Sequence, residues 1–213
     1  MNGSSRGNSF STLRRFARQA QKSRAQHRCE LCSVALPAQH QHLLDLSSRA
    51  LVCGCQACTL LFSEQTEKYR PIPRQTFSLP GFQMSDGEWD SFAIPISLAF
   101  LYYDSSAKKM IAMYPSPAGA TQSLLSLETW ETLVMNNPIL LEMIPDVQAL
   151  LVNRIRGEAN YYLVPIDECF RLVGLIRIHW RGLSGGSEVW QEIEQFFAAL
   201  NKKARPATET YHA

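Results

Sequence analysis

Hydrophobic and polar positions in the second half of the chain follow two spacings, which predict both strands and helices. Apolar runs typical of strands occur at residues 94–103, 109–114 and 160–164. Apolar residues at helical spacing, or a Pro suited to a first turn, predict helices at residues 127–137, 146–152, 166–180 and 188–203. We therefore expect a mixed α/β domain over residues 89–205.

Short polar segments predict how these elements begin and end. Residues 104–108 are typical of a hairpin turn, and residues 114–120, rich in Pro, Gly and Ala, are expected to form a loop. Ser126 and Ser187 are predicted to cap the helices that follow them. Asp167 is expected to cap its own helix, where a negative charge is favourable.

The first half of the chain has shorter apolar segments. Residues 1–26 are expected to be a disordered tail followed by a basic helix, which carries a thin apolar stripe over residues 11–26. Residues 42–46 and 50–53 suit two short strands, and residues 59–62 suit a short helix. Residues 67–88 contain several prolines and are expected to be a linker between the two halves.

Four cysteines between residues 27 and 66 form two Cys-x-x-Cys pairs, which predict a metal-binding finger. Cys29 and Cys32 are separated by 22 residues from Cys55 and Cys58. Two residues between ligands allow a tight turn to direct both thiolates at one ion, and two such pairs complete a tetrahedron of sulfur. The order of turn, hairpin and helix predicts an α+β fold in which a treble-clef or zinc-ribbon-like finger precedes the α/β domain.

The metal and the ligand set have alternatives. Zinc is the first expectation, but four thiolates also suit a single iron, as in rubredoxin. Cys53 lies two positions before Cys55 and is an alternative ligand. His40 and His42 lie between the pairs and are more often solvated or packed than ligating, and Cys169 is expected to be a buried core residue.

Composition and charge narrow the function classes. No apolar run is long enough to span a membrane, and the first residues lack the apolar core of a secretory signal, so a cytoplasmic protein is expected. Residues 1–75 contain 11 Lys/Arg against 4 Asp/Glu, whereas residues 76–213 contain 10 against 15. The basic half is suited to an acidic protein partner or, less favourably, to nucleic acid.

The rest of the sequence carries no set of residues typical of an active site. Paired carboxylates, a nucleophile with its base, and a dinucleotide fingerprint are all missing, so we do not expect an enzyme. His179, Trp180 and Arg181 combine side chains that often anchor interfaces, and they are candidate partner-binding residues.

Specific strings spread over residues 27–201 resemble one uncharacterised bacterial family, whose members are encoded beside uptake nickel–iron hydrogenase genes. The strings are CELC at 29–32, HLLDL at 42–46, CGCQACTLLF at 53–62, YRPIP at 69–73, YPSPAGAT at 114–121, PDVQALLVN at 145–153, YLVPID at 162–167 and HWRGLSGG at 179–186. The resemblance implies an accessory protein for hydrogenase assembly or maturation, with a hydrogenase subunit or another maturation factor as partner. A rubredoxin-like electron-transfer or redox-sensing protein and a nucleic-acid-binding zinc-finger regulator remain the alternatives.

Overall fold

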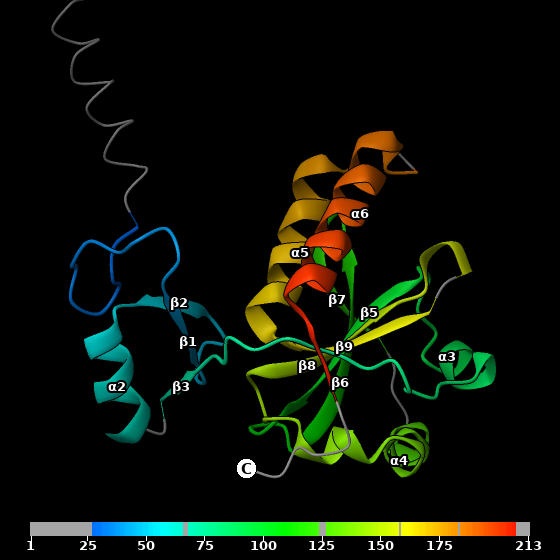
Figure 1. Ribbon diagram of the computed structural model, residues 1–213, viewed down its shortest axis with the longest axis horizontal. Coiled ribbons are helices and arrows are strands. Elements are labelled where there is room, and N and C mark those ends of the chain that lie inside the picture. Colours follow the sequence, from blue (N-terminus) through cyan, green and yellow to red (C-terminus); the bar gives the residue numbers. More distant parts are fainter. Residues whose placement is uncertain (1–26, 66–67, 124–126, 158, 183, 208–213) are drawn as a thin grey trace, which may run out of the picture.

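The computed structural model describes residues 27–65, 68–123, 127–157, 159–182 and 184–207. The predicted tail, the basic helix and Ser126 lie outside these residues. Two sheets organise the described part of the chain, one with three strands and one with seven (Figure 1).

The small sheet is antiparallel and has the strand order β2-β1-β3. It is built from β1 (Gln41–Asp45), β2 (Leu51–Gly54) and β3 (Tyr69–Pro71), and helix α2 (Gln56–Gln65) follows β2 directly. The predicted strands and the short helix at residues 59–62 are therefore confirmed. The turn between β1 and β2 forms because Asp45 accepts hydrogen bonds from the backbone N–H groups of Ser47 and Ser48, at 2.9 and 3.1 Å.

The large sheet has the strand order β10-β4-β9-β8-β5-β6-β7, and only the β10–β4 pair is parallel. Its strands are β4 (Phe77–Ser78), β5 (Leu98–Asp104), β6 (Lys109–Ser116), β7 (Gly119–Ser123), β8 (Gln148–Asn153), β9 (Asn160–Pro165) and β10 (Arg205–Pro206). The helices beside it are α3 (Asp86–Ser91), α4 (Leu127–Asn136), α5 (Ile166–His179) and α6 (Gly186–Lys203), with short 3₁₀ turns at Pro138–Glu142 and Ile155–Gly157.

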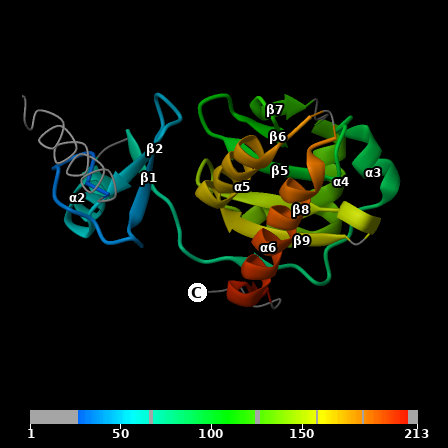
Figure 2. The same ribbon diagram turned by 90° about the horizontal axis from the view of Figure 1, so that it is seen from above.

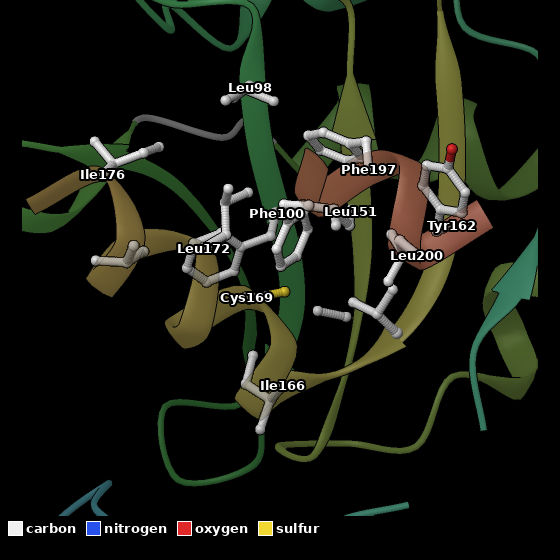
Figure 3. Packing of buried hydrophobic residues seen from close by; sticks show 14 of the residues in the cluster. Leu98, Phe100, Leu151, Tyr162, Ile166, Cys169, Leu172, Ile176, Phe197 and Leu200 are labelled. Atoms are coloured by element: carbon white, nitrogen blue, oxygen red, sulfur yellow. The ribbon is translucent and has the colours of Figure 1, made fainter. Parts of the chain in front are cut away.

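Strand alternation divides the interior into two cores, one on each face of the large sheet. Leu98, Phe100 and Leu151 point to the face that α5 and α6 cover side by side, together with the buried Cys169 (Figures 2 and 3). The opposite face buries another set against α3, α4 and the first 3₁₀ turn: Ala99, Leu101, Leu150 and Val152 with Trp89, Phe92, Leu133 and Leu140. The mixed α/β architecture is thus a three-layer arrangement around one sheet.

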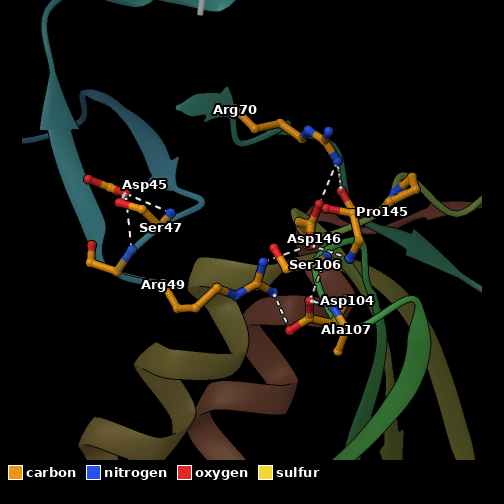
Figure 4. Close-up of polar contacts among 11 residues, drawn as sticks. Asp45, Ser47, Arg49, Arg70, Asp104, Ser106, Ala107, Pro145 and Asp146 are labelled. Carbon is orange, nitrogen blue, oxygen red and sulfur yellow. Dashed lines mark hydrogen bonds and ion pairs between the residues drawn. The ribbon is translucent and has the colours of Figure 1, made fainter. Parts of the chain in front are cut away.

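The small sheet is fixed to this arrangement by apolar and charged contacts. Leu44 and Ile72 are each 2% exposed and belong to the same core as α5 and α6. Beside them, Asp146 receives Arg49 Nη1 at 2.7 Å and Arg70 Nη1 at 2.6 Å, as Figure 4 shows. The Asp146 side chain is fully buried, so this carboxylate depends on the two arginines for its charge compensation.

The helix predicted at residues 146–152 is wrong, because this segment forms strand β8. β8 lies between β5 and β9, and its side chains are buried on both faces of the sheet, because Ala149 and Leu151 enter one core and Leu150 and Val152 the other. Its central run, residues 149–152, is apolar at every position and shows no alternation, so its period does not separate strand from helix. Asp146 also has a left-handed backbone, with φ of 67°, which is incompatible with a first helical turn.

The loop predicted at residues 114–120 is also wrong, because β6 continues to Ser116 and pairs with β7. Pro115 is tolerated because β5 stops pairing at Met113, so this end of β6 has a neighbour on one side alone. Ser187 does not cap α6 either: the helix begins at Gly186, and Gly185 occupies the cap position without a side-chain hydrogen bond.

Among the described residues, no helix combines the length and apolar character needed to cross a membrane.

Candidate metal centre

The first cysteine pair lies on a tight turn closed by backbone hydrogen bonds. The Ser33 N–H donates to the Cys29 carbonyl at 2.7 Å, and the Cys29 N–H donates to the Val34 carbonyl at 2.9 Å. Ser33 is left-handed, with φ of 65°, which reverses the chain within a few residues. The turn is joined to β2 by a hydrogen bond from the Glu30 N–H to the Cys53 carbonyl at 2.9 Å.

The second pair lies where β2 ends and α2 begins. The Cys55 carbonyl accepts a helical hydrogen bond from Thr59 N–H at 2.9 Å, and the Cys58 N–H lies 3.4 Å from the Cys55 sulfur. Gly54 permits this close approach of strand and helix, because a Cβ there would lie 2.8 Å from Thr59 Oγ1. The partial positive charge at a helix N-terminus favours thiolates at these positions.

The structure brings the sulfur atoms of all four predicted ligands together, within 4.8 Å of one another. The Cys32 and Cys55 sulfurs are 3.7 Å apart, and all the cysteines are free thiols. A tetrahedral zinc site with Zn–S bonds of about 2.3 Å places its sulfurs about 3.8 Å apart. A disulfide would require about 2.05 Å. The spacing therefore suits four ligands around one ion.

The electrostatics of the cluster point the same way. Burial by itself raises the pKa of Cys29, but the backbone N–H groups of Cys55, Cys32 and Leu31 outweigh it and lower that pKa to about 6. Burial, followed by the neighbouring thiols, raises the pKa of Cys58 to about 12. The protein therefore stabilises the thiolate of Cys29 but disfavours a second thiolate at Cys58 in the absence of positive charge. A divalent cation would supply the positive charge that four thiolates need.

Cys53 lies beside a different set of side chains from the four-cysteine cluster. With His40 and His42 it forms a second group of potential ligands, in which one ligand atom of each of the three residues lies within 4.8 Å of the others. The Glu30 carboxylate is also close, because it accepts a hydrogen bond from the Cys53 N–H at 2.5 Å. Sequence reasoning missed this second group because it considered the histidines as ligands of the first ion. The signal was present in the pairing of the two predicted strands, which sets His42 opposite Cys53.

Asp167 also has a role that the sequence did not indicate. It lies in the first turn of α5, but the cap position is Pro165 and has no side-chain hydrogen bond. Asp167 Oδ2 instead contacts His42 Nδ1 at 2.7 Å. Asp167 does lie in the first turn, where the helix dipole favours its charge, but the expected side-chain cap does not form, because the carboxylate turns towards the small sheet.

The candidate partner-binding residues lie at the end of α5 and are held by contacts within the chain. His179 Nδ1 lies 2.8 Å from Glu188 Oε1, and the Trp180 indole donates to the Gly182 carbonyl at 2.9 Å. Arg181 donates to the Ile178 carbonyl at 2.7 Å. The Ile178 side chain beside them is 65% exposed.

These features define a class: a mixed α/β protein with a four-cysteine candidate metal centre near residues 29–58. A family of unknown function, DUF5947, has a sequence model that matches residues 28–204, so the chain belongs to this family. No curated protein and no solved structure that was compared with the chain matches it.

Proposed function

We propose that this chain is a metal-binding accessory protein whose four-cysteine cluster holds one structural zinc ion. The observation that carries this proposal is the convergence of Cys29, Cys32, Cys55 and Cys58 within 4.8 Å. A closed set of four thiolates leaves no coordination position for a substrate, so the ion stabilises the fold rather than catalyses a reaction.

The order of elements around the cluster favours a treble-clef finger over a zinc ribbon. The first pair lies on a turn, the β1–β2 hairpin follows, and the second pair lies at the start of α2. A zinc ribbon would carry its second pair on a turn without a following helix. The metal would thus hold a small unit that buries few apolar side chains, Leu43 and Leu44 among them.

The family resemblance directs the proposal towards nickel–iron hydrogenase assembly or maturation, through contact with a hydrogenase subunit or another maturation factor. Support for this direction comes from the hydrogenase genes that neighbour members of the resembled family. The end of α5 is the proposed contact surface, because exposed Ile178 and Arg181 lie beside the half-buried Trp180.

Nucleic-acid binding has less support from the described part of the basic half. Each Lys and Arg between residues 27 and 75 contacts an oxygen within the chain: Arg28 with Ser33, Arg49 and Arg70 with Asp146, Lys68 with Asp45, and Arg74 with Gln41. Such side chains are less available for phosphates.

Deletion of the gene in a hydrogenase-bearing strain, followed by complementation, tests the proposal. Loss of hydrogen-uptake activity, restored by the wild type, is expected. Affinity capture of the full-length protein should enrich a hydrogenase polypeptide, and Ile178→Ser should weaken that capture. Met135→Ser is the matched control, since Met135 is 78% exposed but lies on α4. Normal hydrogenase activity in the deletion strain would contradict the proposal.

Elemental analysis with a visible spectrum separates zinc from the iron alternative. A ferric four-thiolate site is strongly coloured, whereas a zinc site is colourless. Zinc in anaerobically purified, colourless protein is expected, and iron with visible charge-transfer bands would instead support the rubredoxin-like function.

A further inference from the structure

The β1–β2 hairpin places an imidazole and a thiol opposite each other on one face. His42 is the direct partner of Cys53 in this ladder. His42 and Leu44 share a face of β1 because strand side chains alternate, and Leu44 packs into the core with α5. The pair therefore lies on the face directed at α5, where Asp167 contacts His42.

His40 completes a group of three potential ligands. One ligand atom from each of His40, His42 and Cys53 lies within 4.8 Å of the other two. The two imidazole rings meet edge to face, with centroids 4.9 Å apart. All three residues are half-buried.

Both imidazoles are oriented by acceptors at Nδ1. His42 Nδ1 lies 2.7 Å from the Asp167 carboxylate, and His40 Nδ1 lies 3.0 Å from the Pro37 carbonyl. A carbonyl or carboxylate oxygen accepts a hydrogen bond, so in the neutral form of each ring Nδ1 carries the hydrogen and Nε2 carries the lone pair. Metal-ligating histidines commonly have this arrangement, with one nitrogen on the metal and the other donating to a carboxylate or a backbone carbonyl.

The remaining nitrogen of His40 lacks a partner. Among the described residues, His40 Nε2 is buried and has no hydrogen bond. A buried polar atom without a partner costs free energy, and such atoms are uncommon in folded proteins. A cation at this position would remove that cost.

We propose that His40, His42 and Cys53 form a second metal site, which binds a divalent first-row transition metal ion through two Nε2 atoms and one thiolate. Binding displaces to solvent the Cys53 thiol proton and any proton on Nε2 of a protonated imidazole, so both histidines ligate in the neutral form. Three protein ligands leave the fourth tetrahedral position open to water or to a ligand from a partner. This site thus suits an ion that is exchanged or delivered, whereas the four-cysteine cluster retains its ion.

Anaerobic titration of metal-free, full-length protein with Co²⁺ tests the second site. The wild type is expected to bind two equivalents. Thiolate-to-cobalt charge-transfer absorbance grows with the number of thiolates, so the ion at the second site adds about a quarter of what the four-cysteine ion adds. A His40→Asn/Cys53→Ser variant should bind one equivalent and lose the weaker increment.

His179→Asn is the matched control, because His179 also pairs with a carboxylate but is not part of either potential metal-binding group found in the described residues. It should bind two equivalents. Binding of one equivalent by the wild type, or an unchanged stoichiometry and spectrum in the double variant, would overturn the proposal.

Folding and the first site have separate readouts in this design. In the His40→Asn/Cys53→Ser variant, the four-thiolate absorbance bands report whether the four-cysteine cluster has formed. If those bands are missing, the test is repeated with His40→Gln, which changes a residue outside the strands. Cys32→Ser should weaken the four-thiolate bands and leave the second-site increment. A failure of the cluster and a failure of the second site are therefore distinguishable.

Discussion

The Asp146 carboxylate lies 2.7 Å from Arg49 Nη1, a contact between residues 97 positions apart that ties the small sheet to the large one. Asp146→Asn removes the charge that compensates Arg49 and Arg70, while Asn still tolerates the left-handed backbone at this position. Because both arginines are partly exposed, we expect the free energy of unfolding to fall by about 1–3 kcal/mol. Urea unfolding of metal-loaded protein measures this change. Glu194→Gln is the control, because it breaks a more exposed pair with Arg156 and should change the free energy of unfolding by less than about 0.5 kcal/mol. Equal effects of the two variants would contradict a stabilising role of Asp146 between the two sheets.

The same carboxylate predicts a pH dependence. Burial raises the pKa of Asp146, but hydrogen bonds from Ser105 and the pairing with Arg49 outweigh it and lower the pKa below its ordinary value of 3.8. A lowered folded-state pKa contributes stability that is present above pH 3.8 and is lost as the pH falls through the folded-state value. The stability difference between wild type and Asp146→Asn should therefore shrink below about pH 4. A difference that grows on acidification would contradict this assignment.

Two glycines should respond in opposite directions to alanine. Gly185 has φ of +87°, and a Cβ there would lie 2.8 Å from Val189 Cγ1 and 3.1 Å from Trp180. Gly185→Ala should lower the free energy of unfolding by about 1–3 kcal/mol. Gly174 lies within α5, and a Cβ there would have no neighbouring atom within 4 Å, so Gly174→Ala should raise the free energy of unfolding. The expected gain is about 0.5–1 kcal/mol. Thermal unfolding with calorimetry distinguishes the two signs.

Asp167 is expected to tune the proposed second metal site. Asp167→Asn keeps the shape of the side chain but removes the carboxylate that orients His42, so the Co²⁺ affinity of that site should fall by roughly 10–100-fold. The four-thiolate absorbance should stay unchanged. Glu188→Gln, which alters the partner of His179, is the control and should leave both affinities as they are. If Asp167→Asn left the Co²⁺ affinity of the second site unchanged, the contact between Asp167 and His42 would have only a structural role.

Local patterns gave most of the elements and all four clustered cysteines. Helices α5 and α6 were predictable because their apolar residues recur at helical spacing over many turns, and the two Cys-x-x-Cys pairs specify their own geometry. Helix α3 was missed, although Ser85 and Glu88 form a capping box that is visible in the sequence.

Contacts between distant residues were the part that the sequence did not reveal. Pro145 suits a first helical turn and a strand buried on both faces shows no alternation, so the sequence predicts a helix where β8 lies between its two neighbours in the sheet. The contact between His42 and Asp167 joins residues 125 positions apart. A short-range pattern carries no information about such a pair, so the group of His40, His42 and Cys53 can be recognised only in the folded structure.

The claim on which the rest depends is that one ion occupies the four-cysteine cluster. Native mass spectrometry of the His40→Asn/Cys53→Ser variant, combined with thiol alkylation, measures this occupancy without interference from the second group. Cys32 is exposed, so burial does not protect it from the reagent, whereas a bond to metal would. We expect one zinc ion per chain and a protected Cys32 that reacts once a chelator removes the metal. A metal-free chain whose Cys32 reacts at the rate of a free thiol would contradict the claim.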